Sequence, residues 1–211
     1  MCYGLACGDY MTSKKLDREY FQDHALLVAP KLLGLVIINQ AKSLVITEVE
    51  AYGGFDDQAS HAYRGISKRN RSMFCQPGTL YVYLSYGIHC CINIVTERIG
   101  TGGAVLIRGG IAFEGDLRDG GEGLLPFIVS GPGRVGRFLD VGLDDDGLDL
   151  LDSDRFRIVD LGFEFGTFTL PNSTERVGIS KAADLPWRFI IDNKQAIKLL
   201  SDRAKLSGVK L

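Results

Sequence analysis

Short β-rich runs, separated by glycine-containing turns, dominate this chain and constrain its fold more than any other feature. Two of them flank Tyr86-Gly87, a spacing that predicts a β-hairpin. The predicted strands cover residues 35–39, 43–52, 80–85, 88–96, 103–108, 156–159, 164–170 and 187–191. Helical patterns are fewer: residues 17–33, which Pro30 should kink or divide and Gly34 should end, then 134–139, then 192 to about 205.

This mixture of hairpins and outlying helices predicts an α+β fold. We expect a mixed, largely antiparallel and curved sheet with peripheral helices and a protruding hairpin. The 211 residues suit one domain over 1–211, with residues 1–16 as a poorly ordered N-terminal segment. Residues 53–78 form a long irregular loop, and such loops in compact domains are usually functional.

Composition excludes several classes of protein. Hydrophobic residues make up 45% and charged residues 24%, which argues against disordered and fibrous chains. The longest apolar stretch, residues 32–38, is far shorter than the roughly 20 residues of a membrane span. The N-terminus lacks a secretory signal, and the five cysteines include no CxxC pair. We therefore expect a cytoplasmic protein with reduced thiols, no membrane association and no bound metal.

Charge is distributed unevenly along the chain. The net charge is −2, yet residues 58–113 hold six basic residues and one acidic residue, and so carry +5. A local basic face can hold phosphates even in an acidic protein. The alternative is a basic loop that is simply solvated.

A G-x-G-x-x-G match at Gly131, Gly133 and Gly136 raises the possibility of a nucleotide-cofactor oxidoreductase. An apolar run precedes it, and Asp152 follows at about the spacing of a dinucleotide-binding site. However, only a few helical residues follow the motif, and the strand pattern is not a repeated βαβ. The motif is therefore weak evidence for such a cofactor.

The strand over residues 43–52 ends with unusual polar side chains. With a period of two, Glu48, Glu50 and Tyr52 share one face with Leu44 and Ile46. Ionised carboxylates are rarely buried without a partner or a task. The alternative is that this end of the strand meets solvent.

The predicted hairpin carries further candidates. Tyr81 and Tyr83 alternate along its first strand, and Tyr86 lies at its tip, where a bulky aromatic suits a partner or a packing role. Asn93, on the second strand, is the only amide among apolar residues and thiols. A buried amide must be satisfied by the backbone or by a ligand.

Taken in order, several segments resemble the alkyladenine (3-methyladenine) DNA glycosylases of the non-helix-hairpin-helix type. The similarity extends over residues 20–191. The segments are Glu48-Val-Glu-Ala-Tyr52, Ala59-Ser-His-Ala-Tyr-Arg-Gly65, Arg69-Asn-Arg-Ser-Met-Phe74, Pro77-Gly78, Tyr81-Val-Tyr83, Tyr86-Gly87, Cys91-Ile-Asn93, Val105-Leu-Ile-Arg108, Ser130-Gly-Pro-Gly-Arg134, Arg176-Val-Gly-Ile179 and Pro186-Trp-Arg-Phe189. This ordered set makes the G-x-G-x-x-G match look accidental, since the family has its own Gly-Pro-Gly there and does not need the third glycine.

The resemblance implies a role for each matched residue. Glu50 falls on the general base that activates water, and Arg108 on the residue that helps hold that water and a nearby phosphate. The other matches are Tyr52, His61 and Tyr83 as walls around the extruded base, Tyr86 as the side chain that fills the gap in the DNA, and Asn93 as the residue that discriminates against guanine. In the basic segment we expect DNA backbone contacts from Arg64, Lys68, Arg69 and Arg71. Ile88, Lys68 and Gly109 depart from the family pattern. These departures bear on which lesions are accepted and on how the DNA is bound.

The resemblance thus implies a monofunctional glycosylase that excises alkylated, and possibly deaminated, purines from double-stranded DNA. A base inside a duplex must be extruded before an enzyme can reach it, and stacked aromatic walls suit that task. We expect a monomer without a cofactor. A catalytically silent DNA-lesion-binding protein on the same scaffold is the second reading, and the presence of Glu50 argues against it.

Overall fold

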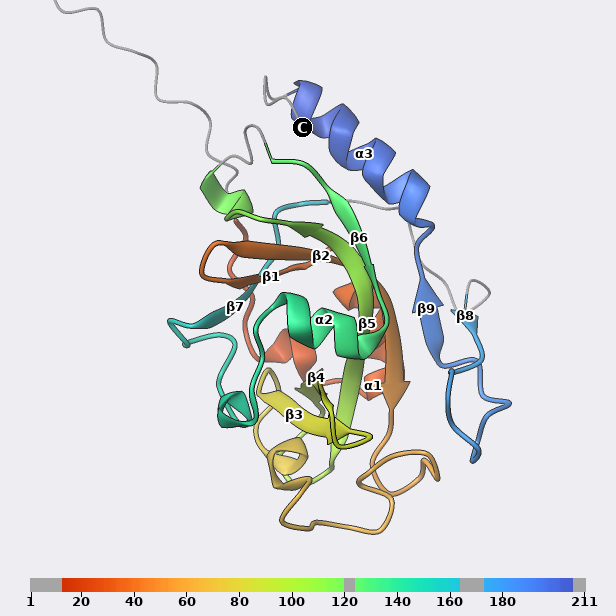
Figure 1. Cartoon of the computed structure of the whole chain (residues 1–211). Coiled ribbons are helices and arrows are strands. Elements are labelled where there is room, and N and C mark those ends of the chain that lie inside the picture. Colours follow the sequence, from red (N-terminus) through yellow and green to blue (C-terminus); the bar gives the residue numbers. More distant parts are fainter. Residues whose placement is uncertain (1–12, 120–123, 164–172, 207–211) are drawn as a thin grey trace, which may run out of the picture.

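One curled antiparallel sheet forms the body of the protein (Figure 1). The computed structural model describes residues 13–119, 124–163 and 173–206. Every strand pair found there is antiparallel, so the predicted α+β class is confirmed. Its strands are β1 (Val36–Asn39), β2 (Lys42–Tyr52), β3 (Leu80–Ser85), β4 (His89–Thr96), β5 (Gly103–Phe113), β6 (Phe127–Ser130), β7 (Phe156–Val159), β8 (Ser173–Thr174) and β9 (Arg188–Ile190).

The strand order places β2 and β5 at the centre of the sheet. The main path runs β3-β4-β5-β2-β1-β7, while β6 pairs with β5 and β9 pairs with both β2 and β8. The last part of β2, which carries both glutamates, therefore lies between β5 and β9. Strand β5 extends to Phe113, five residues beyond its predicted end, because β2 and β6 both pair with that extension.

The register between β2 and β5 is irregular beside Glu48. It shifts on both sides of this residue and skips Thr47 on β2 and Arg108 on β5. Such bulges interrupt the side-chain alternation of a strand and often redirect a side chain. The uniform alternation predicted for residues 43–52 is interrupted here.

The helical region predicted over residues 17–33 is present but discontinuous, and the expected division near Pro30 is found. The segment divides into η1 (Glu19–Phe21), α1 (Ala25–Val28) and η2 (Ala29–Leu32). His24 caps α1 by accepting the N–H of Leu26, so the helix begins there. Pro30 lies at the start of η2 and has no N–H to continue an α-helix. The predicted stop at Gly34 holds, with a φ of 89°.

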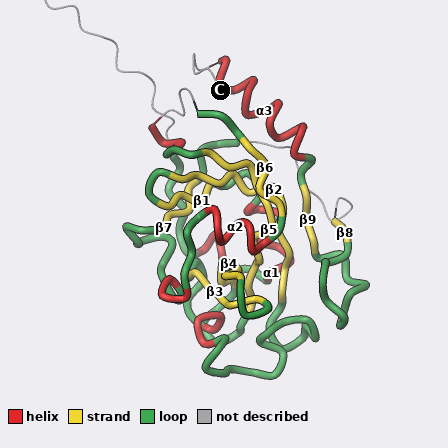
Figure 2. Tube along the Cα trace, viewed as in Figure 1, coloured by secondary structure: helices red, strands yellow, loops and turns green. Residues whose placement is uncertain are grey.

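The later helices lie at the periphery, as predicted (Figures 1 and 2). Helix α2 (Pro132–Phe138) packs on β4 and β5, and α3 covers Asn193–Leu206. Gly136 has a packing reason, because a Cβ there would lie 2.0 Å from the carbonyl oxygen of Cys90 on β4. The third glycine of the motif is therefore required by this close approach of α2 to β4.

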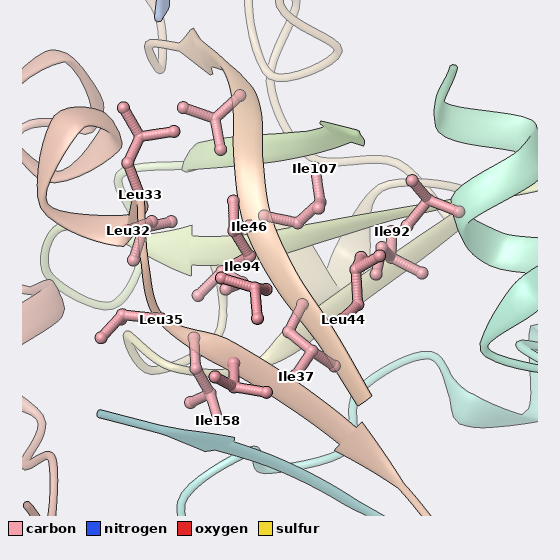
Figure 3. Close-up of a cluster of buried hydrophobic side chains, with 14 of the residues drawn as sticks. Leu32, Leu33, Leu35, Ile37, Leu44, Ile46, Ile92, Ile94, Ile107 and Ile158 are labelled. Carbon is pink, nitrogen blue, oxygen red and sulfur yellow. The ribbon is translucent and has the colours of Figure 1, made fainter. Parts of the chain in front are cut away.

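The hydrophobic core fills the curled sheet (Figure 3). Side chains of β1 and β2 meet those of β4, β5 and β7, and the segment 32–35 closes one side. A smaller cluster of Ala62, Met73, Phe74, Tyr81, Val95 and Ala104 anchors the loop between β2 and β3. That loop contains a short helical turn, η3 (Arg71–Phe74), and is otherwise irregular, as predicted.

Some predicted segments fall partly or wholly outside the described ranges. The predicted strand over 164–170 lies outside them, as do residues 1–12 of the predicted N-terminal segment. In the remainder of that segment, Lys14 pairs with Asp160 and Leu16 is buried. Within the described residues, no helix has the length and apolar character needed to cross a membrane.

Candidate active site

A cavity of about 410 Å³ opens between the β3–β4 hairpin, β5 and the segment around residue 178. The hairpin, the irregular loop and the 177–179 segment each contribute to its wall. Its lining residues are Tyr52, Ala59, His61, Arg69, Met73, Tyr81, Tyr83, Ser85, Tyr86, Asn93, Leu106, Arg108, Pro132, Val177, Gly178 and Ile179. This cavity brings together most of the residues singled out in the sequence.

Glu50 lies directly behind the cavity wall and is fully buried. Its Oε1 accepts the backbone N–H of Val177 at 2.7 Å, and its Oε2 accepts the hydroxyl of Tyr52 at 2.9 Å. Nη1 of Arg108 lies 3.4 Å from Oε2. A buried carboxylate with these donors is held in a fixed orientation. The expectation that this strand end meets solvent is thereby excluded for Glu50.

Arg108 bridges the two glutamates of β2. Its Nε donates to Oε1 of Glu48 at 3.1 Å and lies 3.4 Å from Oε1 of Glu50. The same Glu48 oxygen accepts Nε of Arg188, on β9, at 2.8 Å. Glu48 therefore lies inside the polar network, which its sequence position alone did not indicate.

Tyr52 forms one aromatic wall and is held from behind. The guanidinium of Arg176 lies 4.8 Å from its ring centroid and 5.1 Å from that of Trp187. Burial raises the pKa of Tyr52, and the Glu50 carboxylate raises it further. The hydroxyl thus keeps its proton and donates it in the bond to Glu50.

A fully buried ion pair joins the two loops beside Tyr52. Nη2 of Arg176 donates to Asp57 at 3.0 Å and Nη1 donates to the carbonyl of Ala51 at 2.9 Å. The Asp57 carboxylate also accepts the N–H groups of Gly53 and Ala59. Because Val177 follows Arg176, this pair also fixes the N–H that reaches Glu50.

His61 and Tyr83 form the opposite side of the cavity. Their ring centroids are 4.6 Å apart at an interplanar angle of 85°, and Nδ1 of His61 lies 2.8 Å from the Tyr81 hydroxyl. His61 is in part exposed, but the partial burial of its ring lowers its pKa, and nearby Arg69 lowers it further. A neutral imidazole is therefore favoured at pH 7.

Asn93 is buried on the cavity floor, where its side chain serves the backbone. Nδ2 donates to the carbonyl of Tyr81 at 3.1 Å, and only 4% of the residue is exposed. This bond fixes the amide, so a ligand meets a side chain that is already positioned. The sequence left open whether the backbone or a ligand satisfies this amide. The backbone supplies at least one partner, the carbonyl of Tyr81.

Tyr86 lies at the tip of the predicted hairpin and is 89% exposed. Its φ of 50° is unusual for a residue other than glycine. The neighbouring Ile88 is 71% exposed, so the tip presents two large apolar side chains to the surroundings. Few intramolecular contacts hold either of them.

The four basic residues expected at the DNA backbone all lie exposed in the loop between β2 and β3. Only Arg69 lines the cavity, where its guanidinium lies 5.7 Å from the Tyr83 ring centroid. Arg64, Lys68 and Arg71 lie outside that lining, and among the described residues none of the four has an ion-pair partner.

Sequence reasoning missed several residues that hold the site together. Their partners are far away along the chain, and although most of them lie in segments that carry the family resemblance, the resemblance assigns them no role. These residues are Asp57, Arg176, Val177 and Arg188, along with Glu48 as an arginine partner. Among the described residues, no group of three or more His, Cys, Asp or Glu side chains could hold a metal.

The dinucleotide-cofactor interpretation does not fit the structure. The binding fold it requires is built on parallel strands, whereas every described pair here is antiparallel. Gly131 has a φ of 101° and opens a helix of only seven residues. The glycines serve the turn and the packing of α2.

Comparison with known proteins gives a consistent result. Residues 19–195 match the family described as Methylpurine-DNA glycosylase (MPG). A protein of Mycolicibacterium fortuitum is 42% identical over 194 aligned residues. The alignment covers 87% of this chain and 98% of that protein. Proteins of Chlorobium phaeobacteroides (38% identical; 88% and 98% covered) and Ehrlichia ruminantium (36% identical; 89% and 95% covered) are similar. All three carry the name "Putative 3-methyladenine DNA glycosylase".

Proposed function

The chain belongs to the methylpurine-DNA glycosylase family and is a DNA glycosylase, and from this premise we propose that it removes methylated purines by water attack directed by Glu50. The observation that supports this proposal most is the fully buried carboxylate of Glu50 behind an aromatic-walled cavity. A carboxylate so placed can orient water and take its proton.

The cavity has the dimensions and walls that a flipped purine needs. Its volume of about 410 Å³ falls within the range of small-molecule sites, roughly 300–1,000 Å³. A base in a duplex must leave the stack to reach it, and we propose that Tyr52, His61 and Tyr83 stack around the extruded base. A neutral His61 suits a methylated purine that carries a positive charge.

The reaction needs one ionised carboxylate and no acid for a cationic base. Water attacks C1′ of the deoxyribose while the C1′–N bond breaks and its electron pair goes to the purine nitrogen. Glu50 takes the proton of the water, and its negative charge stabilises the oxocarbenium-like transition state. Because a methylated cationic purine departs as a neutral base, it needs no proton from the protein. Arg108 lies beside Glu50 and the cavity, where it can hold the water or a phosphate.

The surrounding surface suits double-stranded DNA. We propose that Tyr86, exposed at the hairpin tip, fills the space left by the flipped base. Arg64, Lys68, Arg69 and Arg71 then contact phosphates, and Asn93 excludes guanine through its fixed amide. We propose that one chain acts alone, since these residues all belong to a single copy.

Deaminated purines form a second substrate class in this proposal. A neutral base such as hypoxanthine departs as an anion unless it is protonated, so its release should be slower than that of methylated purines. No lysine lines the cavity among the described residues, which favours simple hydrolysis over a Schiff-base lyase reaction.

Release of bases from DNA methylated with dimethyl sulfate tests this proposal. We expect free 3-methyladenine by chromatography, with strands that break only after alkali treatment. A parallel duplex with hypoxanthine should react more slowly. Binding of methylated DNA without base release would favour the silent lesion-binding protein and overturn the proposal.

A further inference from the structure

Two carboxylates share the guanidinium of Arg108, and the sharing is unequal. The contact with Glu48 is 3.1 Å, whereas both contacts with Glu50 are 3.4 Å. Glu50 has shorter bonds from Tyr52 and Val177, at 2.9 and 2.7 Å. Arg108 is therefore drawn toward Glu48 and only loosely paired with Glu50.

Glu48 is itself held by a second arginine. Nε of Arg188 lies 2.8 Å from the Glu48 oxygen that also accepts from Arg108. All three side chains are mostly buried, with 22% of Arg188, 14% of Glu48 and 13% of Arg108 exposed. Screening by solvent is correspondingly weak, so the charges act on one another.

The backbone makes room for this arrangement. A Cβ at Gly109 would lie 3.3 Å from Oε2 of Glu48 and 3.1 Å from the carbonyl oxygen of Val129. The register shift beside Glu48 places Arg108 outside the regular β2–β5 pairing. Both features favour a Glu48 side chain that points at the two arginines.

We infer that Glu48 and Arg188 are positioning residues that set the basicity of Glu50 through Arg108. Glu48 attracts the Arg108 guanidinium and so keeps it from pairing closely with Glu50. Arg188 binds the same Glu48 oxygen and thereby weakens the attraction between Glu48 and Arg108. The inference rests on the proposed function, in which Glu50 takes a proton from water.

Substitution of the two residues should shift the pH dependence in opposite directions. In Glu48→Gln, a negative charge disappears and Arg108 can move onto Glu50, so the carboxylate becomes a weaker base. In Arg188→Gln, a positive charge disappears and Glu48 pairs more strongly with Arg108, so Glu50 becomes a stronger base. If the two residues had a purely structural role, their substitutions would not shift the pH dependence in opposite directions.

Other groups near Glu50 stay in place in both variants. From β2 the Tyr52 hydroxyl faces it, and from the 176–179 segment the Val177 N–H does so. Arg176 lies behind Tyr52, and Tyr83 of β3 lies across the cavity within electrostatic range. Among the groups that face Glu50, the two substitutions thus change only the interaction with Arg108.

The test is single-turnover release of 3-methyladenine from dimethyl-sulfate-treated DNA, measured from pH 4.5 to 9. This cationic base needs no acid, so the acid limb of the profile reports the base alone. We expect the midpoint of that limb to fall by about one pH unit in Glu48→Gln, the lower end for a closer opposite charge. It should rise in Arg188→Gln. Glu19→Gln, an exposed residue of η1, is the matched control and should change nothing.

Each outcome decides the inference. Midpoints that shift in opposite directions support it, whereas a uniform loss of rate with unchanged midpoints overturns it. If Glu48→Gln does not fold, Arg188→Gln decides alone, and an unchanged or lower midpoint overturns the inference. If the unaltered chain releases no methylated base, the proposed function fails and this inference fails with it.

Discussion

Replacing Glu50 with glutamine tests the proposed catalytic role most directly. Glutamine keeps the size of the side chain and one oxygen, which can still accept the Val177 N–H. Its amide N–H₂ group then faces the Tyr52 hydroxyl, which can turn and accept. The same N–H₂ group also faces Nη1 of Arg108. Both groups are hydrogen-bond donors, so that contact is lost.

The cost to stability should be moderate. Arg108 keeps Glu48 as a partner and is 13% exposed, so its charge is not left isolated. We expect a loss of about 1–3 kcal/mol, the cost of one unsatisfied buried polar contact. For a chain of this size, each kcal/mol lowers the Tm by about 2–4 °C. The variant should therefore be folded at assay temperature.

The cost to the reaction should be larger and specific. Glutamine can neither take a proton nor offer a negative charge to the transition state. Single-turnover excision should fall at least about 10²-fold, the lower end for a positioned general base. That factor corresponds to about 2.7 kcal/mol of lost transition-state stabilisation. Affinity for lesion DNA should change little, because the aromatic walls are untouched.

The assay combines single-turnover release of 3-methyladenine, titration of the methylated duplex and a thermal melt. Glu19→Gln provides the matched control, since the same chemical change is made on an exposed side chain. Normal excision by Glu50→Gln would show that Glu50 is a structural carboxylate. A joint fall of rate, affinity and Tm would indicate a collapsed pocket and would also refute the argument.

Four further predictions concern the rest of the site. Tyr86→Ala should weaken binding of lesion duplexes while the Tm stays within 1–2 °C or so, because the side chain is 89% exposed; a large fall in Tm with normal excision would assign it to packing. Asn93→Ser should admit guanine lesions more than it slows turnover, and unchanged rejection would place the discrimination elsewhere. Arg71→Gln should lower affinity alike for all sequences and flatten the salt slope by about one unit, which a titration from low to moderate salt measures. His61 has a pKa below its ordinary 6.5, so the unfolded state binds more protons and stability falls as pH drops from 6.5; His61→Gln should reduce that fall in pH-dependent melts.

Local patterns predicted the parts of the fold whose partners are nearby in sequence. The β3–β4 hairpin forms around Tyr86 and Gly87 because both residues adopt positive φ, which closes a short turn. The end of the helix region at Gly34 and the final helix follow from equally local signals. The 17–33 segment is not one continuous helix, because α1 begins only after its His24 cap and because Pro30, as expected, has no N–H to continue an α-helix.

The supports of the candidate site could not be read from the sequence, because their contacts are long-range. Glu48 and Arg188 are 140 positions apart, and Glu50 and Val177 are 127 apart. A buried carboxylate predicts that some cation or donor is nearby, yet it does not identify which one. The pairing of β9 with β2 makes that choice, and β9 has only three residues.

Burial distinguishes the roles of Arg176 and Arg108, two arginines beside Tyr52 and Glu50. Arg176 has a fully buried side chain between Tyr52 and Trp187, and its terminal nitrogens are taken by Asp57 and by backbone carbonyls. Leaving one partner of such a pair unmatched costs roughly 3–5 kcal/mol, so Arg176 suits a structural role. Arg108 reaches the cavity, and its bonds to Glu50 are long. Such a guanidinium can exchange a protein contact for one with water or phosphate, which a catalytic site requires and a buried ion pair does not allow.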